Sequence, residues 1–157
     1  LNYYLEQFRT TMFRQTMFAE FEKMTHEEVE RGGALTADWL CENYRRLNLD
    51  YYGAEVTVDP EIDIEWARIP HFYSAFYVYK YATGFSAANA LAEGILSGKP
   101  GAVERYLDFL SAGSSDYPLN VLAKAGVDMS SPEPVRQALR LFERLLDEME
   151  IMAEQHL

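Results

Sequence analysis

The chain has 157 residues, of which 48% are hydrophobic and 14% aromatic, a composition typical of one globular domain with a buried core. Its formal net charge of -11 disfavours binding to nucleic-acid phosphates and to anionic membrane surfaces. Charged residues interrupt every apolar stretch before it reaches the ~20 residues that span a bilayer. The single cysteine, Cys41, excludes an intrachain disulfide and is expected to be a core thiol in a cytoplasmic protein.

Apolar residues at helical spacing predict a long first helix, from Leu1 to about Met24. These residues lie on more than one face, so the helix should be buried on several sides inside a larger assembly. Because the sequence starts within this pattern, we expect it to be a piece of a longer protein. The uncovered apolar face also predicts that the isolated piece self-associates or binds a partner fragment.

The remaining pattern predicts an all-α fold with at most one short strand near residues 55–58. Thr36 is the expected N-cap of the second helix, and Ser131 followed by Pro132 is a strong start signal for the last one. Glycines and prolines delimit the helices that follow the first. We expect them at Ala37 to about Leu49, His71 to about Leu96, Ala102–Leu110, Pro118 to Gly126, and Pro132 to about Gln155.

One short segment resembles a zinc site. Residues 26–30, His-Glu-Glu-Val-Glu, look like the start of the HExxH helix of zinc peptidases. That motif needs a second imidazole four residues after the first, and here the position holds Glu30. We therefore interpret the segment as an exposed acidic turn. The other histidines, His71 and His156, lie far apart, so we predict no metal ligands in this chain.

The stretch 65–85 contains the side chains best suited to catalysis. On a helix, Tyr73, Tyr77 and Tyr81 would share one stripe. Such a stripe is more often structural core than active site, but buried tyrosine hydroxyls need hydrogen-bond partners. His71 directly follows a proline-fixed turn at the expected helix mouth. Neutral histidine and tyrosine side chains together can donate hydrogen bonds to a developing oxyanion.

Three runs, Phe8–Glu22, Ile69–Tyr73 and Phe76–Gly84, resemble the sequences that follow the metal site in the oligoendopeptidase F family. Later segments, including Tyr117-Pro118 and Ala125–Met129, continue the pattern in the family's order and spacing. The resemblance covers the whole chain. It implies that residues 1–157 are the C-terminal helical part of a metallopeptidase catalytic domain, with the HExxH pair and the third zinc ligand upstream.

The resemblance also implies a function. This family, related to thimet oligopeptidase, consists of cytoplasmic zinc metallopeptidases that cut short peptides in a channel between helical lobes. Zinc-bound water attacks the scissile carbonyl there, with the upstream HExxH glutamate as general base. By motif, His71 and the tyrosines after it match the opposite wall, which binds substrate and oxyanion. One alignment favours Tyr79 as the oxyanion donor and another favours Tyr73 or Tyr77, so all three stay candidates.

The same resemblance sets the expected partners. They are zinc in the full-length enzyme, an oligopeptide substrate and the remainder of the peptidase chain. Glu20 and Glu22 are not expected to replace the missing zinc ligands, and the isolated fragment should be inactive. The alternative is a non-catalytic all-α binding or scaffolding module whose aromatic stripe is structural core. A reading frame that continues upstream into an HExxH helix would favour the peptidase.

Overall fold

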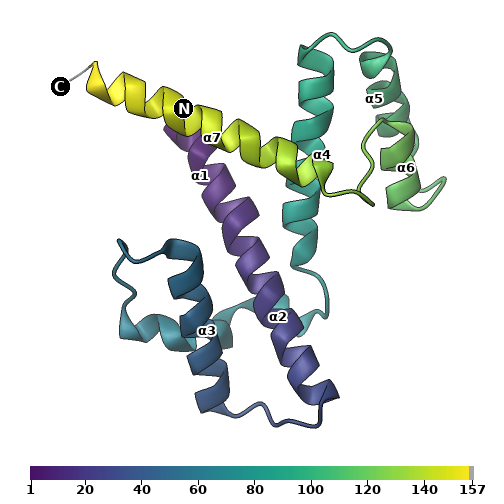
Figure 1. Cartoon of the computed structure of the whole chain (residues 1–157). Coiled ribbons are helices and arrows are strands. Elements are labelled where there is room, and N and C mark those ends of the chain that lie inside the picture. Colours follow the sequence, from purple (N-terminus) through teal and green to yellow (C-terminus); the bar gives the residue numbers. More distant parts are fainter. Residues whose placement is uncertain (156–157) are drawn as a thin grey trace. The chain divides into compact units, whose positions relative to one another are not determined.

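The computed structural model describes residues 1–155, and these form helices joined by turns and loops (Figure 1). The all-α prediction is confirmed. We expected at most one short strand, near residues 55–58. These residues form a loop. The chain divides into two compact units. We call Arg9–Ala82 the central unit, and Leu1–Phe8 with Thr83–Leu157 the terminal unit.

The first helical stretch is longer than expected and is not uniform. It consists of α1 (Asn2–Gln7), a π-helical segment (Phe8–Phe13) and α2 (Arg14–Glu30). A π-helical turn closes its hydrogen bonds five residues apart rather than four. The buried residues follow this change, because Met17 is the next buried position after Met12. The extra residue therefore keeps the apolar side chains buried through the segment.

In the central unit, α3 (Ala37–Tyr52) packs against both α2 and the 3₁₀ helix η2 (Pro60–Arg68). The buried core of this unit comprises Met17, Phe18, Phe21, Tyr44, Leu47, Ile69 and Val78. The Thr36 side chain accepts a hydrogen bond from the Trp39 amide at 3.2 Å, which confirms the predicted N-cap. Cys41 is only half-buried, so the expectation of a core thiol is wrong.

The predicted helix at His71 begins later than expected. Pro70–Tyr73 is a short 3₁₀ helix, η3, and α4 (Tyr79–Leu96) starts only after a turn. The prediction failed because aromatic residues continue at helical spacing through this turn. Tyr73 therefore lies in η3, Tyr77 lies in the turn, and only Tyr81 lies in α4.

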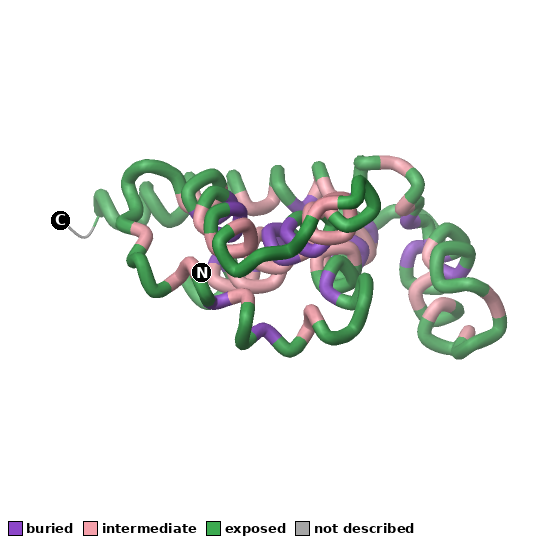
Figure 2. The backbone as a smooth tube through the Cα atoms, turned by 90° about the horizontal axis from the view of Figure 1, so that it is seen from below, coloured by how far each residue is buried: buried purple, intermediate pink, exposed green. Residues whose placement is uncertain are grey.

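The terminal unit contains α1, most of α4, α5 (Ala102–Ser111), α6 (Pro118–Lys124) and α7 (Glu133–Glu154). Phe8 is fully buried, and its ring centroid lies 4.9 Å from that of Phe85 and 5.2 Å from that of Phe142. The last helix begins at Glu133 with Pro132 as its N-cap, one residue later than predicted, and Ser131 accepts a hydrogen bond from the Glu133 amide at 3.2 Å. Figure 2 shows that buried residues alternate with exposed ones along the helices, as one-sided packing produces.

Candidate functional site

Within the central unit, three of the side chains in the aromatic stretch meet. The hydroxyls of Tyr77 and Tyr81 are 3.0 Å apart, and the Tyr81 hydroxyl lies 3.5 Å from Nε2 of His71. The imidazole stacks on the Tyr77 ring, with centroids 5.5 Å apart and planes 15° from parallel. We call these three residues the His/Tyr cluster. It joins η3, the turn and the first turn of α4.

The turn that brings the cluster together is held in an unusual conformation. The Tyr77 amide donates to the Ser74 carbonyl at 3.1 Å, and Phe76 has a φ of 55°. A positive φ costs a non-glycine residue on the order of 1–3 kcal/mol. The Phe76 amide offsets part of this cost by donating to the Glu22 carboxylate at 2.8 Å. The Phe76 ring also stacks on His26, with centroids 4.5 Å apart.

The two tyrosines of the cluster are partly exposed. Tyr77 is 38% exposed and Tyr81 is 37% exposed, so neither ring is sealed in the core. The hydrogen bond to Tyr77, with a smaller contribution from desolvation, raises the pKa of Tyr81. The Lys80 ammonium lies 4.5 Å from the centre of the Tyr77 ring. The stripe is therefore not fully buried within this chain.

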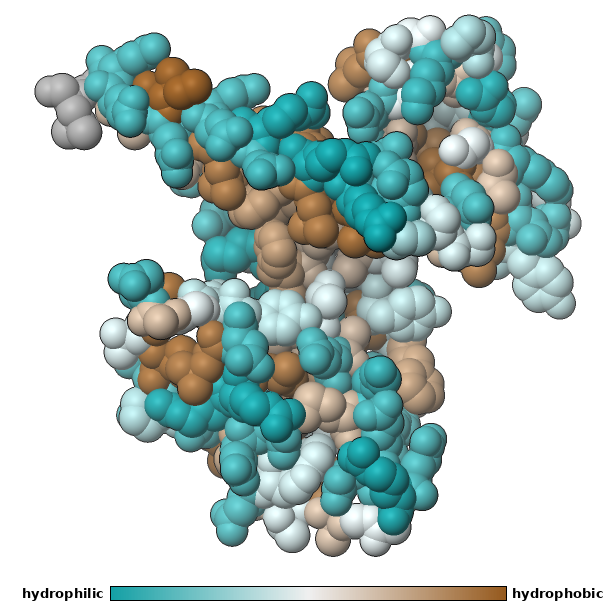
Figure 3. Space-filling model, viewed as in Figure 1, coloured by the Kyte–Doolittle hydropathy of each residue, from teal (hydrophilic) through white to brown (hydrophobic). Residues whose placement is uncertain are grey.

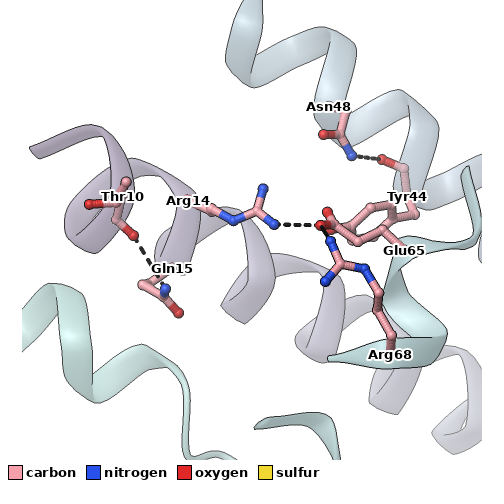
Figure 4. A network of polar contacts seen from close by, with 7 residues as sticks. All are labelled: Thr10, Arg14, Gln15, Tyr44, Asn48, Glu65 and Arg68. Carbon is pink, nitrogen blue, oxygen red and sulfur yellow. Dashed lines mark hydrogen bonds and ion pairs between the residues drawn. The ribbon is translucent and has the colours of Figure 1, made fainter. Parts of the chain in front are cut away.

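A polar network fixes the segment that leads to the cluster. Glu65 of η2 accepts hydrogen bonds at 2.6 Å from Arg14, Tyr44 and Arg68 (Figure 4). Burial alone would raise the pKa of the Glu65 carboxyl, but the hydrogen bonds from Tyr44 and Arg14 and the charges of both arginines lower it overall. Burial of Tyr44 and its bond to Glu65 raise the pKa of the phenol. Carboxylate and phenol therefore keep opposite protonation states at neutral pH.

The predicted site residues occupy different places. His71 and Tyr77 belong to the cluster, whereas Tyr73, in η3, is 82% exposed. Tyr79 begins α4 and is 49% exposed. The sequence placed Tyr81 on the stripe through its spacing of four from Tyr77, but Tyr81 was not chosen as a catalytic candidate.

Glu22 and Phe76 were missed for a different reason. Their hydrogen bond joins positions 54 residues apart, so no local pattern reports it.

The histidine, cysteine and acidic side chains of residues 1–155 do not form a complete metal site. Among them, no group of three or more His, Cys, Asp or Glu side chains is arranged to hold one. His26 stacks on Phe76, and residues 26–30 form the end of α2 rather than the exposed turn that was predicted, with His26 to Glu28 half-buried. His156 lies outside the described residues. The same part of the chain contains no helix long and apolar enough to cross a membrane.

Comparison with known proteins identifies the family. The model of peptidase family M3 matches residues 1–141. The chain belongs to this family. It is 58% identical over 151 residues to oligopeptidase PepF of Bacillus subtilis, covering 96% of this chain and 22% of that protein. It is 53% identical over 150 residues to group B oligopeptidase PepB of Streptococcus agalactiae, covering 96% of this chain and 25% of that protein.

A solved structure gives the same result. The chain matches the crystal structure of oligoendopeptidase-F from Enterococcus faecium with a TM-score of 0.96 and 51% identity, over 98% of this chain and 30% of that one. The resemblance to the oligoendopeptidase F family is thereby confirmed. The chain spans about a quarter of the length of the curated relatives that it matches.

Proposed function

We propose that this chain is the C-terminal helical part of the catalytic domain of an oligopeptidase that hydrolyses short peptides. Membership of peptidase family M3 and the names of the relatives support a peptidase parent. The contribution of this chain would be the wall that binds the substrate and its oxyanion. The observation that carries this proposal is the His/Tyr cluster, a set of neutral donors on exposed rings.

The hydrogen bonds of the cluster suggest an order of donation. Nε2–H of His71 would donate to the Tyr81 oxygen, and the Tyr81 hydroxyl would donate to the Tyr77 oxygen. Either tyrosine hydroxyl can donate to the other, and the order proposed here uses the proximity of Nε2 of His71 to the Tyr81 hydroxyl. The Tyr77 hydrogen is then available for the carbonyl oxygen of a peptide. Chains of hydrogen bonds polarise one another, so the last donor is strengthened.

Tyr73 and Tyr79 would bind substrate beside this cluster. Both side chains are exposed, and both flank the turn that carries Tyr77. A peptide carbonyl that meets either hydroxyl gains a neutral donor without the desolvation cost of a buried charge.

The zinc that the family implies would be held by the remainder of the peptidase chain, because the described residues do not fit it. Glu22 in particular already accepts a hydrogen bond from the Phe76 amide. We propose a cytoplasmic location on the basis of the family resemblance. The parent chain and an oligopeptide are the partners that this assignment requires.

The test uses the full-length parent enzyme and a quenched fluorescent peptide. Tyr77→Phe should lower kcat by about 10²–10³-fold, the loss typical of one oxyanion donor, with the zinc content unchanged. Tyr117→Phe is the matched control, because Tyr117 is 79% exposed and belongs to the terminal unit. Unchanged kcat in Tyr73→Phe, Tyr77→Phe, Tyr79→Phe and Tyr81→Phe would overturn the proposed role.

A further inference from the structure

A second feature of the central unit is a pocket of about 330 Å³ beside the segment that carries the His/Tyr cluster. Its walls include Phe21, Trp66 and Phe72, and Tyr73 lies at the same pocket. Glu22 and His26 supply polar atoms. The pocket thus combines aromatic walls with one carboxylate. The match to peptidase family M3 does not explain why a carboxylate lies among these aromatic side chains. The sequence motif of the His/Tyr cluster does not explain it either.

The carboxylate of Glu22 is the unusual member of the pocket. Glu22 is only 5% exposed, and its Oε1 accepts one hydrogen bond, from the Phe76 amide. Among residues 1–155, no lysine or arginine forms an ion pair with it. A buried charge is costly unless it is paired, and a carboxylate can accept about four hydrogen bonds. The other buried glutamate of this unit, Glu65, has two arginine partners.

We propose that this pocket is a subsite for a basic side chain, lysine or arginine, of the peptide substrate. The Glu22 carboxylate would pair with the cationic group. The faces of Trp66 and Phe72 would contact the cation and its aliphatic stem, since both interactions are favourable for these side chains. The proposal rests on the proposed function, because it assumes that a peptide binds along the His/Tyr cluster.

Two observations place this pocket next to the cluster. Tyr73 lines the pocket and lies two residues after His71 in the chain. The Phe76 amide, which binds Glu22, directly precedes Tyr77. A residue that lines the pocket and the residue that binds Glu22 are therefore sequence neighbours of His71 and Tyr77. A peptide bound at the Tyr77 hydroxyl would lie beside the pocket.

The first experiment uses the wild-type full-length enzyme, so it does not depend on a variant that folds. Quenched fluorescent peptides carry arginine, citrulline or leucine at each position around the scissile bond. Citrulline has nearly the shape of arginine without its charge. At one position, kcat/KM for arginine should exceed that for citrulline by about tenfold or more, which corresponds to about 1.4 kcal/mol. Equal values at every position would overturn the proposal.

The second experiment assigns this preference to Glu22. In Glu22→Gln the side chain can still accept the bond from Phe76, but the charge is lost. This variant should lower kcat/KM for the arginine peptide to about the citrulline value and leave the leucine peptide within about twofold. Glu30→Gln is the matched control, because it removes one charge from an exposed position at the end of α2. An equal loss in both variants would show general charge steering and overturn the proposal.

The remaining outcomes separate this proposal from the proposed function. If the parent enzyme cleaves no peptide, the proposed function itself fails. If Glu22→Gln lowers the thermal midpoint and affects all peptides alike, Glu22 pairs with a cation of the parent chain, and only the subsite proposal is overturned.

Discussion

The Tyr77 and Tyr81 hydroxyls lie 3.0 Å apart, and the two residues are four positions apart in the sequence. Only one of the two can donate to the other, so the second hydrogen is left for another acceptor. Under the proposed function Tyr81 is this donor, and His71 donates to Tyr81 in turn. Tyr77 therefore presents its hydrogen outward, and the two tyrosines should contribute unequally to activity.

The first prediction follows from this inequality. In the full-length enzyme, Tyr77→Phe should lower kcat more than Tyr81→Phe does, because only Tyr77 would touch the reacting carbonyl. Tyr81→Phe removes a polarising donor, and we expect a loss of about tenfold rather than the 10²–10³-fold of a direct oxyanion donor. Steady-state kinetics with zinc content measured in parallel gives both values. The reverse order of effects would assign the direct contact to Tyr81.

The second prediction concerns the network around Glu65. The side chain is 4% exposed and joins η2 to Arg14 of α2 and Tyr44 of α3. Glu65→Gln should destabilise the chain by about 1–3 kcal/mol, since it leaves buried donors imperfectly paired. Chemical denaturation of the 157-residue chain measures this change. The control is Glu61→Gln, at an exposed position of the same segment, where an equally large loss would show that the network is not responsible.

The third prediction concerns pH. The pKa of the Glu65 carboxyl is lower in the folded state than its ordinary value, so the unfolded chain binds a proton there more readily. The stability that Glu65 contributes should be fully present above the unfolded pKa and lost as the pH falls through the folded one. The difference in unfolding free energy between wild type and Glu65→Gln should stay constant from about pH 7 to 5 and shrink below that. A constant difference down to about pH 3 would contradict it.

Much of the fold could be predicted from sequence, because local chemistry marks its boundaries. Thr36 caps α3 as expected, and α6 starts at Pro118, where a missing amide donor costs nothing. The π-helical segment leaves a weaker mark, the step of five between the buried Met12 and Met17. The sequence alone does not reveal this step, because Phe13 lies between the two methionines and is four residues before Met17. The step of five appears only when the buried residues are known.

The turn before α4 shows why the candidate site could be predicted only in part. Its composition placed His71 and the tyrosines together, but residues 74–77 offer only Ser74, a weak turn signal, and contain no glycine, proline or asparagine. The positive φ of Phe76 instead accompanies the hydrogen bond to Glu22, a tertiary contact. Tertiary contacts of this kind override local propensity and leave no periodic signal.

The fourth prediction uses this turn. At most positions glycine is less stable than alanine, by about 1 kcal/mol in a helix. At position 76 the order should reverse, and Phe76→Gly should be more stable than Phe76→Ala by about 1 kcal/mol, because only glycine adopts a positive φ freely. Both variants lose the ring that stacks on His26, so the comparison isolates the backbone. Leu119, exposed on α6, is the control position where alanine should remain the more stable.

The fifth prediction concerns the isolated chain. Leu5, Phe8 and Met17 of the first helical stretch are buried, whereas Leu1, Tyr3 and Tyr4 at its start are exposed, so only this start belongs to the uncovered surface that the sequence suggested. The terminal unit also has an open apolar groove of about 990 Å³, with Leu96 and Leu110 among its walls. Figure 3 shows hydrophobic side chains among the hydrophilic ones around α5 and α6. Exposed apolar surface of this extent favours association.

We therefore expect the isolated 157-residue chain to form oligomers in a concentration-dependent way in sedimentation experiments. Leu110→Lys should weaken this association, because Leu110 is 59% exposed and lines the groove. Leu119→Lys is the matched control, since Leu119 is 61% exposed on α6 but does not line it. A monomer at all concentrations would contradict the prediction. If both lysine variants weaken association equally, a broader charge effect rather than the groove is responsible, because each adds one positive charge to an acidic chain.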